Sequence, residues 1–352
     1  MPDHRCIYCR TPQTAFSREH VLQYALGGGL EILDAVCGTC NRDVLGPLDR
    51  ALTDYSIVSL GRVGVGPGGY ASKEAESKFA SLIDTPGSGA LEVKMKQGFK
   101  PTIKPQLIID LTTGKETFAA SPETVGDRQS ALEDFRVGLE RFGCDRLKII
   151  TENLGKTVAP RVIRENDRYF FVRAMDEAEG RRLVDFLQKW VTSGTTPTPD
   201  HVGEARHEQP WVVSQIRMDW PAVQCAVAKV GLNYVSSVYG REIALDSRFD
   251  DIREFIFSGR ESSDGRGLVG LQSAPVRGKA QPNSHSVLLV PSKDAVWAAM
   301  CFYDHFEFLV QLSDKSFLNL DPALTYFEHT TRTVRRIPTD ELSAYLDIAT
   351  GT

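Results

Sequence analysis

The stretch that decides the fold is residues 6–49, which read CIYCRTPQTAFSREHVLQYALGGGLEILDAVCGTCNRDVLGPLD. It contains two Cys-x-x-Cys pairs, and their cysteines are Cys6, Cys9, Cys37 and Cys40. Four thiolates in two such pairs are the ligand set typical of a tetrahedral structural zinc site. About 27 residues separate the two pairs, somewhat more than the common zinc-ribbon spacing. This spacing predicts a zinc module with a folded insert between its halves.

The insert and the residue after the last cysteine carry a second pattern. Glu19 and His20 are adjacent and lead into Val21, glycines occupy positions 27–29, and Asn41 directly follows the last cysteine. The order Cys-x2-Cys, Glu-His-Val, Gly-Gly, Cys-x2-Cys-Asn resembles the HNH endonucleases, ββα-metal nucleases whose small fold is often stapled by zinc. The resemblance covers residues 4–58, about a sixth of the chain. It is specific because the zinc spacing, the histidine position and the terminal asparagine agree at once.

The resemblance implies a site for hydrolysis of DNA phosphodiester bonds. In it His20 is the general base, and Glu19 and Asn41 are ligands of a catalytic divalent cation, Mg2+ or Mn2+. Histidine suits proton abstraction because its ordinary pKa lies near neutrality, and oxygen ligands suit a hard cation. A four-thiolate site has no open coordination position, so the zinc is expected to be structural. Arg18 and Arg42 are candidates for binding phosphate, against the alternative of exposed, mobile arginines.

The chain departs from the family pattern at several positions. Many relatives have aspartate where Glu19 stands, and the lysine that often follows the final Cys-Asn is absent, with Val44 and Leu45 in its place. Asp49 matches an acidic position of many Glu-His members, and a salt bridge on a helix surface is the alternative role for it. Locally, we expect the strand to continue through Tyr24, and the glycines to allow positive φ and close approach to a phosphate. We expect a helix after the second cysteine pair, capped by Asn41 and kinked or delayed at 46–47, a Gly-Pro pair.

Composition limits the class of protein. The 352 residues suffice for a substantial core, and no apolar run approaches the roughly 18 residues of a membrane-spanning helix. The N-terminus lacks the layout of a signal peptide. The three remaining cysteines stand singly and are predicted to be buried free thiols: Cys144, Cys225 and Cys301. This usage predicts a cytoplasmic protein without membrane contact.

The charge balance does not by itself indicate nucleic-acid binding. The net charge is −5, but a duplex responds to local basic surface rather than to the sum. Three local clusters of basic residues occur, with solvated faces of an ordinary protein as the alternative reading. They are Lys94, Lys96, Lys100 and Lys104; Arg161, Arg164, Arg168 and Arg173; and Arg332, Arg335 and Arg336.

Glycine- and proline-rich stretches suggest the domain boundaries. We expect a nuclease module at 1–60, a Gly-rich linker at 61–72, a middle region at 73–191, a linker or loop at 192–210, and a C-terminal region at 211–352. Strand and helix patterns alternate in both larger regions, including helices at 128–142, 176–191 and from Pro221, and strands at 285–290, 295–302 and 306–312. The predicted fold class is α+β, with an N-terminal ββα-metal zinc module followed by a larger mixed region.

Two functions of different classes remain open from the sequence. The first is a metal-dependent DNA endonuclease whose C-terminal region targets or regulates it, for example in defence against phage. A partner protein or a nucleotide signal would then be its trigger, and oligomers are compatible with this reading. The alternative is a non-catalytic zinc-ribbon adaptor that binds nucleic acid or protein and does not need His20.

Overall fold

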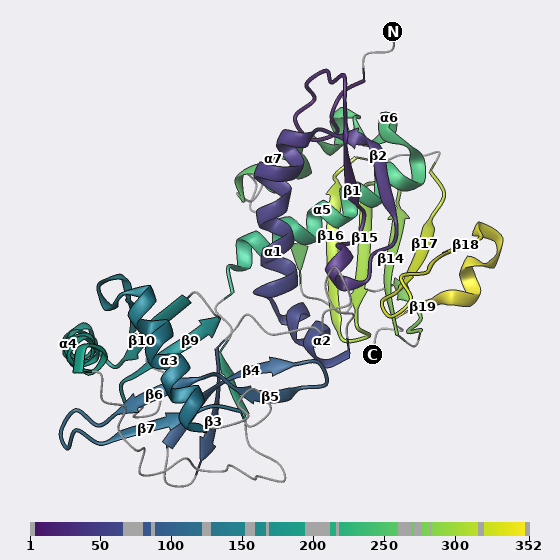
Figure 1. Ribbon diagram of the computed structural model, residues 1–352. Helices are drawn as coiled ribbons and strands as arrows, with labels where there is room; N and C mark the ends of the chain where they lie inside the picture. The colour runs from purple at the N-terminus through teal and green to yellow at the C-terminus, as the bar shows by residue number, and fades with distance from the viewer. Residues whose placement is uncertain are drawn as a thin grey trace. The chain divides into compact units, whose positions relative to one another are not determined.

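A computed structural model describes most of the chain. The described residues are 4–65, 80–85, 89–121, 128–151, 159–166, 169–193, 212–215, 218–259, 269–270, 276–281, 283–315 and 320–348. They form two compact units, and the first combines residues 1–78, 96–99 and 216–352, whereas the second combines 79–95 and 100–215. The zinc module and the C-terminal third of the chain therefore share one unit (Figure 1).

The N-terminal part of the first unit is a hairpin followed by helices. Strands β1 (Ser17–His20) and β2 (Glu31–Val36) pair antiparallel. A π-helical segment, Cys40–Leu45, continues into α1 (Gly46–Asp54), and α2 (Ile57–Val65) follows. This strand-strand-helix order confirms the predicted ββα module. The strand ends at His20 and a 3-10 turn covers Tyr24–Leu26, so the prediction of a strand through Tyr24 was wrong.

The π-helical segment explains how the helix passes Pro47. The N–H of Gly46 donates to the carbonyl of Asn41, a wider turn than in an α-helix. Proline has no N–H and its ring clashes with a carbonyl one α-turn earlier, and a π-turn relieves such a clash. Asn41 lies inside this segment, whose N-cap is Thr39, so Asn41 does not cap the helix as predicted.

Helix α5 (Trp220–Tyr239) is the centre of the first unit. The carboxylate of Asp219 accepts a hydrogen bond from the N–H of Ala222, Pro221 occupies the first turn, and Gly240 ends the helix with φ of 91°. These signals confirm the predicted start and stop. Shorter helices α6 (Arg241–Ala244) and α7 (Asp250–Ser258) follow.

A six-stranded antiparallel sheet completes this unit, in the order β12-β16-β15-β14-β17-β18. Its strands are β12 (Val269–Gly270), β14 (Ser284–Pro291), β15 (Val296–Phe302), β16 (Phe306–Ser313), β17 (Ala323–Glu328) and β18 (Val334–Ile337). A two-stranded pair, β13 (Val276–Gly278) with β19 (Leu346–Ile348), lies beside it. The three strands predicted at 285–312 are confirmed, including their antiparallel order.

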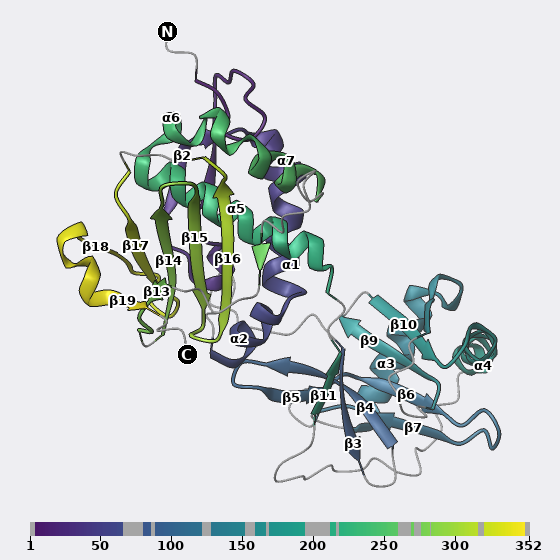
Figure 2. The same cartoon turned by 180° about the vertical axis from the view of Figure 1, so that it is seen from behind.

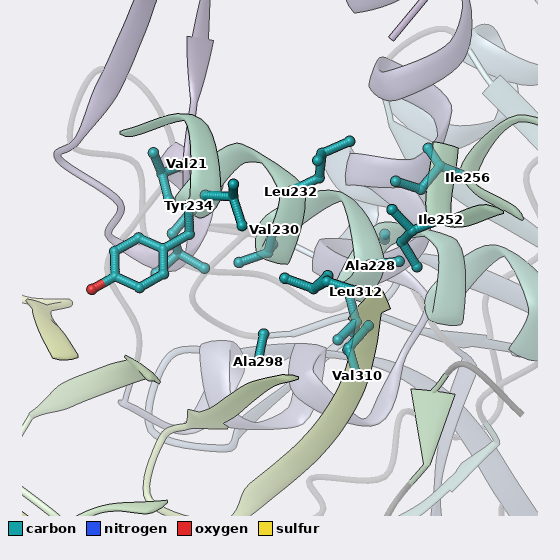
Figure 3. Packing of buried hydrophobic residues seen from close by; sticks show 14 of the residues in the cluster. Val21, Ala228, Val230, Leu232, Tyr234, Ile252, Ile256, Ala298, Val310 and Leu312 are labelled. Atoms are coloured by element: carbon teal, nitrogen blue, oxygen red, sulfur yellow. The ribbon is translucent and has the colours of Figure 1, made fainter. Parts of the chain in front are cut away.

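One hydrophobic core joins these layers. Helix α5 contacts α1 and β2 on one side and β14 and β16 on the other, so it lies between the hairpin module and the sheet (Figures 1 and 2). Figure 3 shows Val310 and Leu312 of the sheet on one side of α5 and the side chain of Leu232 on the opposite side, with Ile252 of α7 beside the helix. The helix is apolar almost all round because both of its sides are covered.

The second unit is α+β by itself. It holds a five-stranded sheet, β7-β6-β9-β10-β8, and a four-stranded sheet, β11-β3-β4-β5. The first comprises β6 (Gln106–Ile109), β7 (Glu116–Ala119), β8 (Lys148–Thr151), β9 (Arg161–Asn166) and β10 (Tyr169–Ala174). The second comprises β3 (Ala80–Thr85), β4 (Gly89–Lys96), β5 (Lys100–Ile103) and β11 (Val212–Gln215). Helices α3 (Arg128–Phe142) and α4 (Glu177–Ser193) pack in its core.

The compact units divide the chain differently from the predicted domains. The predicted linker 61–72 begins inside α2, because Gly61 allows close packing against the ring of Tyr303 rather than breaking the chain; positions 66–72 lie outside the described residues. Strand β11 pairs with β3, so residues 212–215 belong with the second unit. Of the predicted linker 192–210, only the end of α4 lies within the described residues.

Candidate active site

The four cysteines of the two pairs converge at one point. Their sulfur atoms all lie within 4.8 Å of one another, and the Sγ atoms of Cys9 and Cys37 are 3.9 Å apart. Sulfurs bound at ~2.3 Å around a tetrahedral zinc would be roughly 3.8 Å apart. Among the described residues this is the sole cluster of three or more His, Cys, Asp or Glu side chains with metal-site spacing. All seven cysteines are free of disulfides, as predicted.

The four thiols alter one another's pKa values. Contact with the Cys40 thiol lowers the pKa of Cys6 to about 5. The same contact with Cys6 raises the pKa of Cys40, and burial raises the pKa of Cys37. Four sulfurs so close together do not all ionise unless a positive charge lies among them. The cluster therefore fits a metal ion held by four thiolates.

The hairpin presents Glu19 to the protein interior. Glu19 is 3% exposed, whereas its neighbour Arg18 is exposed and His20 is intermediate. Successive side chains of a strand point to opposite faces, so Glu19 and His20 leave β1 on different sides. The two adjacent residues of the motif therefore meet different surroundings.

The Glu19 carboxylate is bound to a lysine of helix α5. The Nζ atom of Lys229 lies 2.5 Å from Oε1 of Glu19 and 2.5 Å from Oδ1 of Asp49, and Lys229 is fully buried. Although burial alone would lower it, the Asp49 and Glu19 carboxylates raise the pKa of Lys229. Burial raises the pKa of Glu19, and the Lys229 ammonium opposes that rise. Asp49, whose side chain is 31% exposed, therefore pairs with a fully buried lysine of α5.

Amide and hydroxyl groups extend this contact. Nδ2 of Asn233 donates to Oε1 of Glu19 (3.1 Å) and to the carbonyl of His20 (3.0 Å). The hydroxyl of Tyr8 donates to Oδ1 of Asn233 (2.7 Å), and burial followed by the Glu19 and Asp49 charges raises the pKa of Tyr8. Helix α5 thus holds both the side chain of Glu19 and the backbone of His20.

Gln23 joins this network through its side-chain amide. Its Nε2 donates to Oδ1 of Asp49 at 2.8 Å. The side chain is buried, and its Oε1 has no hydrogen-bond partner among the described residues. A buried carbonyl oxygen without a partner is costly.

His20 retains a ring nitrogen that can accept a proton. Its side chain is 20% exposed, Nδ1 lies 3.8 Å from Oε1 of Glu31, and Nδ1 has no hydrogen-bond partner among the described residues. The ring lies 5.6 Å from the ring of Tyr24. Burial lowers the pKa of His20, an effect that Glu31 opposes and Lys229 reinforces. A neutral imidazole is the protonation state that a general base requires.

The other predicted site residues lie around the outer end of the hairpin. Asn41 donates from Nδ2 to Oγ of Ser17 (3.0 Å) and to the carbonyl of Arg18 (2.8 Å), and so ties the helical segment to β1. The Arg18 side chain is 70% exposed, with Nε 3.4 Å from Oε2 of Glu31. Arg42 is also exposed and pairs with Asp43. Both guanidinium groups are open to solvent on the hairpin and the helix.

The glycines at 27–29 approach the protein's own chain. Gly27 has φ of 93° and ends the 3-10 turn. A Cβ at Gly27 would collide with the backbone of His329, and one at Gly29 with the backbone of Arg332. These glycines therefore pack the module against the β17–β18 turn, where we expected approach to a phosphate.

Several residues of the predicted basic clusters make ion pairs or hydrogen bonds inside the second unit. Glu92 is buried and pairs with Arg173 (2.8 Å) and Lys104 (3.2 Å), and Arg161 is also buried, with Nη1 3.1 Å from Oε1 of Gln106. Arg168 lies outside the described residues. In the third cluster, Arg335 lies over the rings of Tyr326 and Tyr345. Lys104, Arg161 and Arg173 therefore stabilise a core rather than form a basic surface.

The family resemblance implies Asn41 and Glu19 as ligands of a divalent cation, and in this conformation Asn41 fits that role whereas Glu19 does not. Asn41 lies at the module surface with its amide nitrogen engaged, which leaves its oxygen as the donor atom for a cation. Glu19 is buried, and its Oε1 is bound to both Lys229 and Asn233. An ammonium already neutralises the carboxylate, so Glu19 does not fit as a ligand of a second cation while Lys229 stays in contact.

Two residues of α5, Lys229 and Asn233, belong to this site although they were not predicted from the sequence. Lys229 is the sole charged residue of α5, and Asn233 follows it by one helical turn on the same face. A lone charge in a helix that is otherwise apolar signals a buried partner, so this signal was present. What the sequence did not identify was the partner.

Comparisons with known proteins agree with the module. Residues 6–55 match the family model described as HNH endonuclease. No curated protein and no solved structure matches the chain. Among the described residues no helix has the length and apolar character needed to cross a bilayer.

Proposed function

Because residues 6–55 form an HNH endonuclease module, we propose that the protein is a nuclease that hydrolyses phosphodiester bonds of DNA. In this proposal the neutral ring of His20 takes the proton of the attacking water. The observation that carries it is the match over 6–55, a module that contains both a partly exposed histidine with a lowered pKa and a cluster of four cysteine sulfurs with metal-site spacing.

The metals have separate roles in this proposal. Zinc at the four cysteines holds the hairpin and helix together, because a closed thiolate site has no open position for chemistry. Mg2+ or Mn2+ would supply positive charge at the phosphate, with Asn41 and Glu19 as the proposed ligands and Glu19 available once Lys229 leaves it. Arg18 and Arg42 are the proposed contacts to neighbouring phosphates, since both guanidinium groups are exposed.

Helix α5 supports a regulatory role for the rest of the chain. It contacts both residues of the Glu-His pair from a position far along the sequence. We extend the proposal to a nuclease restrained by its C-terminal region, in the cytoplasm, with a partner protein or nucleotide as trigger. Defence against phage is one context for such restraint.

The test is plasmid nicking with Mg2+ or Mn2+ by the wild type and by His20→Ala. We expect nicking to fall by at least about 100-fold in the variant, as for loss of a general base, while zinc content and circular dichroism stay unchanged. His305→Ala is the matched control, because His305 is an exposed histidine of the β15–β16 turn. Equal nicking by His20→Ala and wild type would exclude His20 from the reaction.

A second function is favoured by the Lys229–Glu19 contact. A module whose acidic motif residue is permanently neutralised would serve as a zinc-stapled adaptor that binds nucleic acid or protein without cutting it. Its signature is binding of DNA by wild type and His20→Ala alike, with no nicking by either protein. RNA and branched DNA should be offered in the same assay.

A further inference from the structure

The second unit contains a hollow lined by three arginines, and we propose that it binds the phosphate and the base of a nucleotide, either free or within a nucleic-acid strand. The cavity has a volume of about 690 Å³. Its arginines come from three segments: Arg141 from α3, Arg146 from the 3-10 turn Cys144–Arg146, and Arg164 from β9. All of them belong to the second unit, so the site does not depend on the proposed activity of the nuclease module.

Unbalanced positive charge is the first observation that supports this site. The lining includes one carboxylate, that of Asp134, against three guanidinium groups. Arg141 is exposed, and its guanidinium makes no ion pair or hydrogen bond with the described residues. By contrast, Arg136 of the same helix pairs with Glu133 (2.5 Å) and Glu140 (3.6 Å). An anion in the hollow would offset the mutual repulsion of its guanidinium groups.

Contacts within the unit hold two of these guanidinium groups in place. Arg146 donates from Nε to the carbonyl of Phe142 at 2.5 Å, and its Cζ lies 5.2 Å from the centroid of the Phe142 ring. Cζ of Arg164 lies 5.8 Å from the centroid of the Phe170 ring. Gly138 makes room for this pair, because a Cβ there would lie 3.1 Å from the Phe170 ring and 3.9 Å from Cζ of Arg164. Guanidinium groups that are already held lose less conformational freedom when they bind a phosphate.

Size and aromatic rings favour a nucleotide over inorganic phosphate. A cavity of about 690 Å³ lies within the range of small-molecule sites, roughly 300–1,000 Å³, and exceeds what a phosphate alone would fill. Phe142 lines the hollow, and the 40% exposed Tyr169 meets it edge to face, with 6.0 Å between the ring centroids. Aromatic rings and guanidinium planes stack on nucleobases, and the guanidinium fork matches phosphate oxygens. The hollow therefore offers charge for the phosphate and flat surfaces for the base.

The experiment measures fluorescence anisotropy of two labelled probes, an ATP analogue and a short oligothymidylate, with zinc-loaded full-length protein. No further divalent cation is added, so that binding is measured without cutting. The wild type should bind at least one probe saturably below about 1 mM. Arg141→Gln should bind that probe about 10-fold more weakly, because it removes one charge-assisted contact to the phosphate. Unlabelled inorganic phosphate should compete more weakly than unlabelled ATP.

Two further variants separate the site from general charge and from folding. Arg181→Gln removes an exposed arginine that pairs with Glu177 on α4 of the same unit, and its affinity should equal that of the wild type. Arg141→Lys keeps the charge without the guanidinium fork, so its affinity should lie between those of the wild type and Arg141→Gln. Thermal unfolding of Arg141→Gln should match the wild type, since Arg141 is exposed.

Defined outcomes overturn the proposal. They are a wild type that binds neither probe, equal affinities of the wild type and Arg141→Gln, or an equal loss in Arg181→Gln. Competition by inorganic phosphate as strong as that by ATP would refute the contact with the base. Tighter binding of the ATP analogue assigns the site to a free nucleotide, and tighter binding of the oligothymidylate assigns it to a strand; either supports the proposal. Loss of nicking in His20→Ala tests the nuclease alone, so the two proposals stand or fall separately.

Discussion

At the scale of single residues, His285 shows how buried polar groups join the module to the sheet. It is fully buried on β14, its Nε2 donates to the carbonyl of Leu26 at 2.7 Å, and its Nδ1 accepts from the N–H of Tyr303 at 3.0 Å. The ring is therefore neutral with the proton on Nε2. Burial lowers the pKa of His285 to about 3, because no water is available to solvate an imidazolium.

This residue makes stability depend on pH. The pKa in the folded protein lies below its unfolded value near 6.5, so its contribution is complete above pH 6.5 and is lost as pH falls toward 3. The loss is about 1.4 kcal/mol per pH unit. We predict that the stability difference between wild type and His285→Gln narrows from pH 7 to pH 5 in urea unfolding. A difference for His285→Gln that stays constant from pH 7 to pH 5 would contradict the prediction.

At the scale of elements, helix α5 packs against the candidate site and contacts its residues. One face packs on the sheet, and Tyr234 donates to Oγ1 of Thr325. The other face supplies Lys229 and Asn233 to the hairpin module. Helix α5 therefore contacts both the sheet and the Glu-His pair.

We predict that Asn233→Ala destabilises the first unit by about 2–4 kcal/mol. The substitution leaves the Tyr8 hydroxyl, the Glu19 carboxylate and the His20 carbonyl without their buried amide partner. Urea unfolding measures the loss, with Ser237→Ala on the partly exposed end of α5 as the control. A loss below 0.5 kcal/mol, the range of ordinary surface substitutions, would show that the amide contacts contribute little.

At the scale of the whole molecule, each of the two compact units has a hydrophobic core of its own among the described residues. One joins the module, α5 and the six-stranded sheet, and the other joins α3, α4 and the five-stranded sheet. Cys6, Cys37 and Cys40 of the sulfur cluster belong to the first core, and Cys144 belongs to the second. Metal binding therefore stabilises one unit and not the other.

Calorimetry should reveal two unfolding transitions. A zinc chelator should lower one of them by more than about 10 °C, because the binding energy of structural zinc is folding energy, and leave the other unchanged. Cys37→Ser should have the same effect as the chelator, whereas Cys144→Ser, a lone buried thiol, should shift the other transition alone. A chelator that lowers both transitions equally would show that the units unfold together.

The sequence by itself determined the local features of this protein. Helix caps and apolar periodicity act within a few residues, so helix α3 at Arg128–Phe142 and the limits of α5 followed from them, and the two Cys-x-x-Cys pairs identified the sulfur cluster by their ligand type. The tertiary structure alone decided what depends on distant partners. Helix α2 in place of a linker, the pairing of β11 with β3, and the engagement of Glu19 with Lys229 each require residues far apart in the chain. A buried charge can be recognised in a sequence, but its partner is chosen by packing, because the free energy of desolvation is recovered only where the fold brings an opposite charge.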